Sequence, residues 1–196
     1  MQIGILIFDR VEEMDFVGPL EVLASACEGR DASVKLVAAT LAPVTCEKGM
    51  RVLPDVAMAD VSALDVLLIP GGSGARLALK HPETVAWVQD VSAGCQWVTS
   101  VCTGSFLLVG AGVATGRRVT THHQFTQALA ALGKADVRSG ARFVADGNVV
   151  SAAGVSSGIE MCLWLVGIMF GDDVMAEVAD YIAYDVPPRG SEVIYE

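Results

Sequence analysis

Residues 97–112 read WVTSVCTGSFLLVGAG, and the hydrophobic pattern changes in the middle of this stretch. β-branched and aromatic residues at 97–101 predict a buried strand, whereas small and apolar residues at 105–113 predict a buried helix. Cys102 falls at the junction between the two. A strand that turns sharply into a helix holds the corner side chain above the sheet edge. This is the geometry of a nucleophile elbow, here with a thiol in place of a hydroxyl group.

The position of Cys102 also predicts its ionisation. Free N–H groups and the positive end of the helix dipole stabilise a thiolate, so the pKa of the Cys102 thiol is expected to be lowered. The competing interpretation is a small buried cysteine that fills a gap in the core, which is the common fate of a free cysteine.

The composition of the 196-residue chain limits its class. With 53% hydrophobic and 18% charged residues, it is expected to form one globular domain over residues 1–196. A net charge of −10 argues against a nucleic-acid partner. The apolar run 161–170 is far shorter than the roughly 18 residues that a membrane span requires, and no signal peptide is recognised, so no membrane association is expected.

Cysteine usage indicates the compartment. The chain has five cysteines at scattered positions and no C-x-x-C pair: Cys27, Cys46, Cys95, Cys102 and Cys162. This usage fits free thiols in a reducing cytoplasm rather than a disulfide framework or a zinc site. A cytoplasmic protein without a metal or another cofactor is therefore expected.

Strands and helices are expected to alternate along the chain. The expected strands span residues 2–8, 32–40, 64–69, 97–101, 117–121, 136–139 and 143–150, with a hairpin at 45–54. The expected helices span residues 19–26, 81–94, 105–113, 125–132, 159–170 and 172–180, and two prolines predict an extended tail at 184–190. This alternation predicts a single-domain three-layer α/β sandwich with a mostly parallel central sheet and helices on both faces.

Two loops and one histidine are expected beside Cys102, because the site of such a sheet lies at the carboxyl ends of its strands. In the acidic loop 9–19, Asp15 has apolar neighbours that carry it inward, where burial raises a carboxyl pKa toward the range of acid–base catalysis. A solvated loop is the more common alternative. The loop PGGSG at 70–74 offers bare N–H groups for an oxyanion, with a plain turn as the alternative. His122 ends the strand 117–121 at the same edge.

Five motifs together resemble the PfpI/ThiJ superfamily, a branch of the class I glutamine-amidotransferase-like fold. They are EEMD at 12–15 with GP at 18–19, IPGG at 69–72, SVCTG at 100–104, TTH at 120–122 and GVSSGIE at 154–160. Many members carry Glu where this chain has Asp15, and Ala where it has Thr103. With these two residues and the segment YDVPP at 184–188, the chain is most similar to the isocyanide hydratase branch.

The resemblance implies a reaction on a small molecule. A Cys102 thiolate attacks the terminal carbon of an isocyanide, R–N≡C, and Asp15 gives that carbon a proton, which leaves a thioimidate on the sulfur. Water then adds with Asp15 as the base, and an N-substituted formamide leaves. One carboxyl group serves both steps only when its pKa is raised, as in an apolar pocket.

The resemblance also implies supporting residues. The N–H groups of Thr103 and Gly72 are expected to orient substrate or water near the sulfur. The N–H of Val155, or the loop around it, is expected to touch the thiolate. His122 belongs to the usual pattern of the superfamily, either in the substrate-binding set or as a structural histidine.

Two other functions stay open at this point. The first is a glyoxalase or another aldehyde-processing activity, which the superfamily supports with a Glu/Cys/His set. Asp15 in place of Glu counts against it. The second is a thiol stress sensor without turnover, because a low-pKa cysteine on an elbow oxidises readily.

A homodimer is expected, with residues 15–27 near the interface. Members of the superfamily commonly pair through this region. In this chain the segment is apolar nearly all round, and one sheet covers only one side of a helix. A self-complementary two-fold contact covers the other side.

Overall fold

An eight-stranded sheet with the strand order β12-β10-β11-β7-β6-β1-β2-β5 forms the centre of the protein in the computed structural model, which describes residues 1–186 and 192–195. Neighbouring strands run parallel except for β10 and β11, which pair antiparallel. The strands are β1 (Gln2–Leu6), β2 (Ser33–Ala38), β5 (Val56–Ala57), β6 (Val66–Ile69), β7 (Trp97–Val101), β10 (Phe143–Asp146), β11 (Val149–Ala152) and β12 (Glu192–Tyr195).

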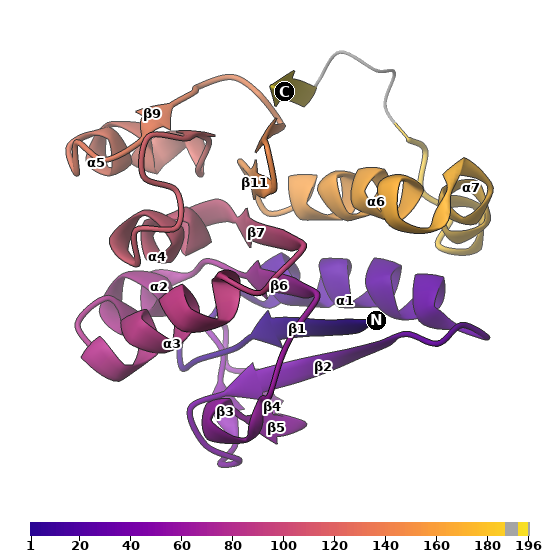
Figure 1. Cartoon of the computed structure of the whole chain (residues 1–196), viewed down its shortest axis with the longest axis horizontal. Helices are drawn as coiled ribbons and strands as arrows, with labels where there is room; N and C mark the ends of the chain where they lie inside the picture. Colours follow the sequence, from indigo (N-terminus) through magenta and orange to yellow (C-terminus); the bar gives the residue numbers. More distant parts are fainter. Residues whose placement is uncertain (187–191, 196) are drawn as a thin grey trace.

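Helices cover both faces of this sheet (Figure 1). One face carries α1 (Glu13–Cys27), α6 (Ser157–Phe170) and α7 (Asp172–Tyr181). The other face carries α2 (Ser73–Ala78), α3 (Pro82–Ser92), α4 (Ser105–Gly110) and α5 (Thr126–Ala130). The prediction of a three-layer α/β fold with a mostly parallel sheet is therefore confirmed.

Short elements complete the described part of the chain. Two strand pairs lie outside the main sheet: β3 (Val44–Thr45) with β4 (Arg51–Val52), and β8 (Arg118–Val119) with β9 (Asp136–Val137). The 3₁₀ turns are η1 (Met58–Asp60), η2 (Cys102–Gly104) and η3 (His123–Phe125). The first strand pair confirms the hairpin predicted at 45–54, and its turn holds Gly49 at a φ of 95°.

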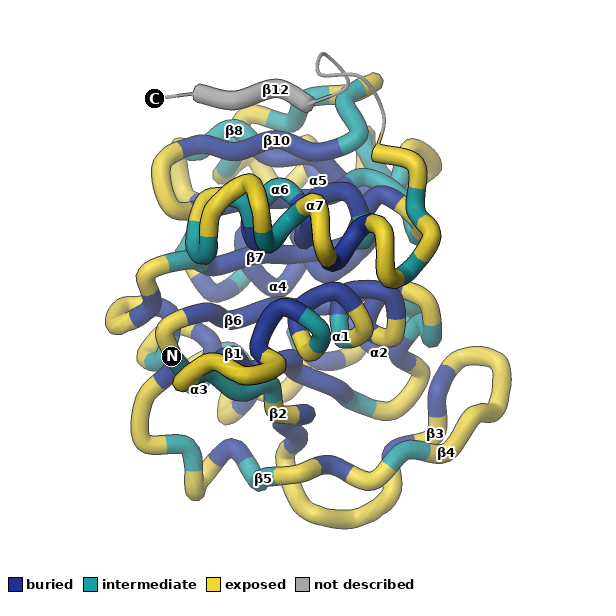
Figure 2. Tube along the Cα trace, turned by 90° about the vertical axis from the view of Figure 1, so that its right-hand side faces the viewer, coloured by how far each residue is buried: buried dark blue, intermediate teal, exposed yellow. Residues whose placement is uncertain are grey.

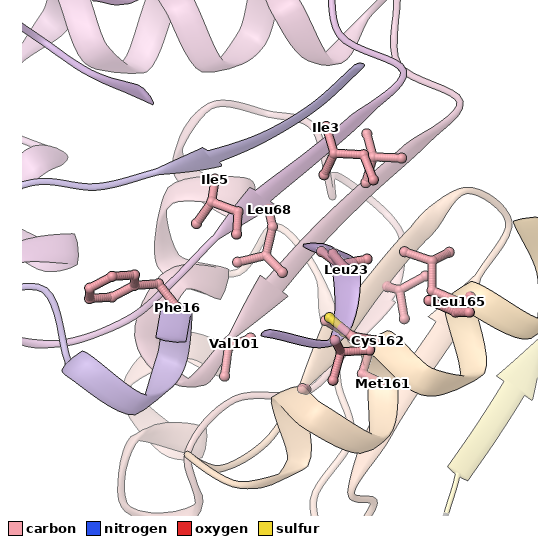
Figure 3. Close-up of a cluster of buried hydrophobic side chains, with 14 of the residues drawn as sticks. Ile3, Ile5, Phe16, Leu23, Leu68, Val101, Met161, Cys162 and Leu165 are labelled. Atoms are coloured by element: carbon pink, nitrogen blue, oxygen red, sulfur yellow. The ribbon is translucent and has the colours of Figure 1, made fainter. Parts of the chain in front are cut away.

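Each central strand sends alternate side chains into two hydrophobic cores. Ile3 and Ile5 of β1 belong to the core beneath α1 and α6, whereas Leu6 belongs to the core on the opposite face. Figure 3 shows the first of these cores, where Ile3 and Ile5 gather with Leu23 of α1 and Leu165 of α6. The strands β6 and β7 are buried almost throughout (Figure 2), so the sheet is a rigid base for the loops at its edge.

Helix α1 begins earlier than predicted. It starts at Glu13 rather than near Pro19, so Pro19 lies inside the helix and not in its first turn. A start at residue 19 was expected because proline is favoured in the first turn of a helix, where the N–H that it lacks would be unpaired. Directly before the first residue of α1, Glu12 N–H donates to Gly71 O at 3.0 Å. Because α1 starts at Glu13, Asp15 lies in its first turn.

The segment predicted as one strand at 143–150 is two strands. β10 and β11 pair antiparallel on either side of a turn in which Gly147 has a φ of 60°. Residues 146–148 thus form the turn of a hairpin, in which Gly147 adopts the positive φ that tight hairpin turns favour. β11 runs on through Ala152, and α6 begins at Ser157.

Two predictions concern other parts of the chain. Within residues 1–186 and 192–195, none of the helices combines the length and the hydropathy that a membrane span requires. The extended tail predicted at 184–190 falls mostly on residues 187–190, which lie outside the described residues.

Candidate active site

Cys102 occupies a strained corner between β7 and α4. Its φ is 54°, in the left-handed region that a residue with a side chain rarely adopts. The 3₁₀ turn η2 joins the strand to the helix without a linker. The turn needs Gly104, because a Cβ atom there would lie 2.0 Å from the carbonyl oxygen of Ile69. The predicted elbow is confirmed by this junction.

Two hydroxyl groups that the sequence analysis did not single out hold the elbow. The carbonyl oxygen of Cys102 accepts a hydrogen bond from Thr121 Oγ1 at 2.9 Å and another from Ser105 Oγ at 3.1 Å. Thr121 belongs to the TTH motif at 120–122, which is the feature of the sequence that marks this residue. The nucleophile is therefore fixed through its backbone as well as through its place in the sheet.

Asp15 lies within reach of the Cys102 thiol and has no exposed surface. Its Oδ2 accepts a hydrogen bond from Gly71 N–H at 3.0 Å, while its buried Oδ1 has no hydrogen-bond partner among the described residues. Burial raises the pKa of Asp15 from 3.8 to about 7, and the negative charge of Glu12 adds to the increase. At neutral pH, Asp15 is therefore suited both to accept and to donate a proton.

The pKa of the Cys102 thiol is raised to about 12, so the predicted decrease is wrong. Burial has the largest effect, and the negative charge of Asp15 raises the pKa further. The N–H of Thr103 acts in the opposite direction but is outweighed. The resting thiol is thus neutral, and it becomes a nucleophile only if a neighbouring base takes its proton. Asp15 is the base in contact with it.

One cavity of about 240 Å³ collects the other predicted residues. Cys102, Thr103, Gly72, His122 and Val155 all line it, although they come from four separate segments of the chain. Six further residues that were not predicted individually line the same cavity: Glu12, Glu47, Ser73, Arg76, Gln124 and Phe125. Among them, the Arg76 guanidinium lies 4.4 Å from the centre of the Phe125 ring, which gives the cavity a flat aromatic wall.

Gly72 and Thr103 bind each other in the structure. Gly72 N–H donates to Thr103 Oγ1 at 3.0 Å, and the Thr103 hydroxyl donates to Gly72 O at 2.9 Å. The Gly72 N–H, which was expected to face substrate, is thus engaged within the protein. Thr103 N–H is the backbone donor beside the sulfur. Gly72 has a φ of 103°, and a Cβ there would lie 2.3 Å from Arg10 O, so only glycine fits.

His122 lines the cavity but is bonded away from the reacting pair. Its Nδ1 accepts a hydrogen bond from Gln124 N–H at 3.3 Å, and its ring packs against His123 and Phe125. Burial and the neighbouring His123 lower its pKa, so it is neutral near pH 7. Within the described residues, no cluster of three His, Cys, Asp or Glu side chains is arranged to hold a metal ion.

Comparison with known proteins identifies the family. Residues 1–167 match the DJ-1/PfpI family. The chain belongs to the DJ-1/PfpI family. This confirms the resemblance found in the sequence motifs, since the family model covers the elbow, the acidic residue and the glycine loop together.

Individual members of the DJ-1/PfpI family are similar over nearly the whole chain. An isonitrile hydratase from Pseudomonas putida is 36% identical over 188 residues, which are 96% of this chain and 80% of that protein. A crystal structure of a ThiJ/PfpI family protein from Pseudomonas syringae superposes with a TM-score of 0.88 at 32% identity, covering 96% of this chain and 76% of that one. Drosophila melanogaster DJ-1beta superposes with a TM-score of 0.84 at 22% identity, covering 94% and 98%, which supports the fold alone.

Proposed function

We propose that this DJ-1/PfpI protein is an isocyanide hydratase, which converts a small-molecule isocyanide and water into an N-substituted formamide. The observation that carries the proposal is the pair formed by Asp15 and Cys102. A buried carboxyl group with a pKa of about 7 lies beside a thiol that is neutral at rest. The similarity to the isonitrile hydratase of Pseudomonas putida supports the same reaction.

In the first half of the reaction, Asp15 takes the proton of the Cys102 thiol. The sulfur then forms a bond to the terminal carbon of R–N≡C, and Asp15 returns its proton to that same carbon. The product is a thioimidate, R–N=CH–S, on Cys102, with no atom left over. Transfer within the pair needs no net change of charge in the buried site, where an isolated charge is unfavourable.

In the second half, water adds to the thioimidate carbon. Asp15, ionised again, takes one proton of the water as the oxygen bonds to carbon, and passes that proton to the nitrogen. The carbon–sulfur bond then breaks, the remaining hydroxyl proton passes through Asp15 to the sulfur, and the formamide R–NH–CHO leaves. Thr103 N–H, which already lies beside the sulfur, stabilises the negative charge that develops there in both halves.

The direct test is incubation of the protein with cyclohexyl isocyanide or an aryl isocyanide, followed by detection of the formamide by mass spectrometry. We expect one formamide per isocyanide consumed, with repeated turnover of each Cys102. A single labelling event without turnover would contradict the proposal and support a thiol sensor. Consumption of methylglyoxal without formamide production would instead support the aldehyde-processing alternative.

The ionisation of Cys102 bears on the choice between enzyme and sensor. Oxidation of a cysteine follows its thiolate character and exposure. A buried thiol with a pKa of about 12 has a small thiolate fraction at neutral pH and little exposed surface. The site therefore suits a thiol that is activated by Asp15 when substrate binds, and this favours the hydratase.

The protein is further proposed to act as a homodimer that pairs through α1. Most of the apolar residues that suggested this interface, including Phe16 and Leu23, are buried within the chain beneath α6. Met14 and Val17 are the large apolar residues of α1 that remain accessible, with exposed fractions of 44% and 38%. They lie one turn apart on the same face, where a second copy of α1 can cover them.

Light scattering at micromolar concentration tests the dimer. We expect a mass of twice 20.5 kDa for the wild type. Val17→Asp places a charge in the expected contact and is expected to yield monomers. Leu53→Asp is the matched control, because Leu53 is 68% exposed outside α1, and it is expected to leave the mass unchanged. A wild-type monomer near 20.5 kDa would exclude the dimer.

A further inference from the structure

The carbonyl oxygen of Cys102 receives two hydroxyl hydrogen bonds that have different origins. Ser105 lies three residues further along the chain, within the same turn. Thr121 lies 19 residues away, after β8, and has an exposed fraction of 1%. The Ser105 bond follows from the local turn, whereas the Thr121 bond depends on the tertiary fold.

The peptide group between Cys102 and Thr103 connects this carbonyl to the reacting sulfur. A peptide group is planar, and in its trans form the C=O and the N–H point in opposite directions. The oxygen of this group is held by Thr121, and its N–H belongs to Thr103 and lowers the pKa of the Cys102 thiol. Any rotation of the plane that loosens one bond therefore misdirects the other.

Thr121 is itself anchored to the central sheet. The preceding residue, Thr120, donates its N–H to Ser151 Oγ at 2.8 Å. Ser151 lies on β11, opposite Ser100 of β7, two residues before Cys102. The hydroxyl that holds the Cys102 carbonyl and the strand that carries Cys102 are thus fixed to the same frame.

We propose that Thr121 is a positioning residue for the nucleophile, whose hydroxyl fixes the peptide plane between Cys102 and Thr103 so that Thr103 N–H points at the sulfur. The effect of Thr121 on turnover rests on the proposed function. Its effect on the ionisation of the Cys102 thiol does not, because that effect is present without substrate. The bond also holds a backbone that is strained at a φ of 54°.

The neighbouring Thr120 provides a matched control. Thr120 has the same exposed fraction of 1%, but its hydroxyl has no hydrogen-bond partner among the described residues. Thr121→Val and Thr120→Val therefore make the same change of shape, and only the first removes a hydrogen bond. Thr121→Ser keeps the hydroxyl and tests whether it is sufficient. Thermal melting followed by circular dichroism confirms that each variant is folded.

The first measurement is the pH dependence of Cys102 alkylation by iodoacetamide, read on the Cys102 peptide by mass spectrometry. In Thr121→Val the rate of alkylation between pH 7 and 9 is expected to be lower than in the wild type at each pH, since the misdirected N–H stabilises the thiolate less. Thr120→Val and Thr121→Ser are expected to react like the wild type over the same range. No substrate is needed, so this result is independent of whether isocyanides are turned over.

The second measurement is turnover of cyclohexyl isocyanide. In Thr121→Val, kcat is expected to fall about tenfold, the equivalent of one neutral hydrogen bond, with KM nearly unchanged. Thr121→Ser is expected to restore kcat, and Thr120→Val to leave it unchanged. If Thr121→Val and Thr120→Val give the same alkylation curve, the positioning role is wrong, even when the wild type proves to be a hydratase. If the wild type turns over no isocyanide, the difference in alkylation rate alone decides the matter.

Discussion

Cys102→Ala is expected to reduce isocyanide turnover by at least about 10⁴-fold, because it removes the atom that carries the thioimidate. Cys102→Ser is expected to be nearly as inactive. A hydroxyl group is a weaker nucleophile, and Asp15, with a pKa of about 7, is too weak a base to ionise it. Formamide production under saturating substrate is the measurement, with circular dichroism to show that the fold is intact.

Cys95→Ala is the control for this result. Cys95 is a free thiol and is buried to nearly the same extent as Cys102, with an exposed fraction of 8% against 7%. It does not line the cavity that contains Cys102. Its removal is expected to leave turnover unchanged. Wild-type rates in Cys102→Ala would refute the covalent mechanism.

Asp15→Asn is expected to lower turnover by about 10²- to 10⁴-fold, which is the usual contribution of one general acid–base group. Glu12→Gln and Glu13→Gln are the comparison variants, and each is expected to lose far less. The three substitutions replace a carboxylate by an amide within one turn of the chain, but only Asp15 is in contact with Cys102. Equal losses in all three would show that the wrong acid was chosen.

The pH dependence of kcat/KM provides a second signature of Asp15. In the wild type it is expected to rise with pH through about 7, because the carboxylate must be ionised to accept the thiol proton. Glu12→Gln removes a negative charge that raises the pKa of Asp15, so the midpoint is expected to move to lower pH. Asp15→Asn is expected to lose the step altogether.

Asp15→Asn is also expected to be more stable against unfolding than the wild type at pH 8. The pKa of Asp15 is raised on folding, so ionisation of this group opposes folding above pH 7, and the effect disappears below pH 3.8, the ordinary value. A shift of this size corresponds to on the order of 4 kcal/mol. An Asn side chain has no such penalty, although its amide is less well matched to the site. Urea unfolding at pH 8 measures the difference.

Sequence patterns were sufficient for the elbow and for the convergence of the loops. The change from β-branched to small residues at 97–112 marks the junction at Cys102 because strands and helices select different side chains. The rule that parallel strands carry their site at the carboxyl edge then placed Asp15 and Gly71 beside it. Both inferences depend on local composition and on topology, which are readable from one chain.

The direction in which the pKa of Cys102 shifts could not be predicted from local composition and topology. The dipole of a helix depends only on the chain immediately after the cysteine. In the folded protein α4 is short, and the larger effects on the pKa are burial and the charge of Asp15, which comes from helix α1, far earlier in the chain. The hydrogen bond from Thr121 to the Cys102 carbonyl could not be predicted for the same reason, because the partner of a hydroxyl group is known only from the tertiary fold.

The pairing of β1, β6 and β7 as neighbours in one parallel sheet has a consequence for how activity arises during folding. Asp15 follows the first of these strands, Gly71 the second and Cys102 the third, and 56 residues separate Gly71 from the carboxyl group that it binds. Parallel neighbours of this kind close long loops, which is slow because chain entropy opposes it until the whole sheet has formed. A growing chain therefore exposes Asp15 to water long before Cys102 exists, with its carboxyl group at an ordinary acidity. The reactive pair comes into being only when the last of the three strands joins the sheet.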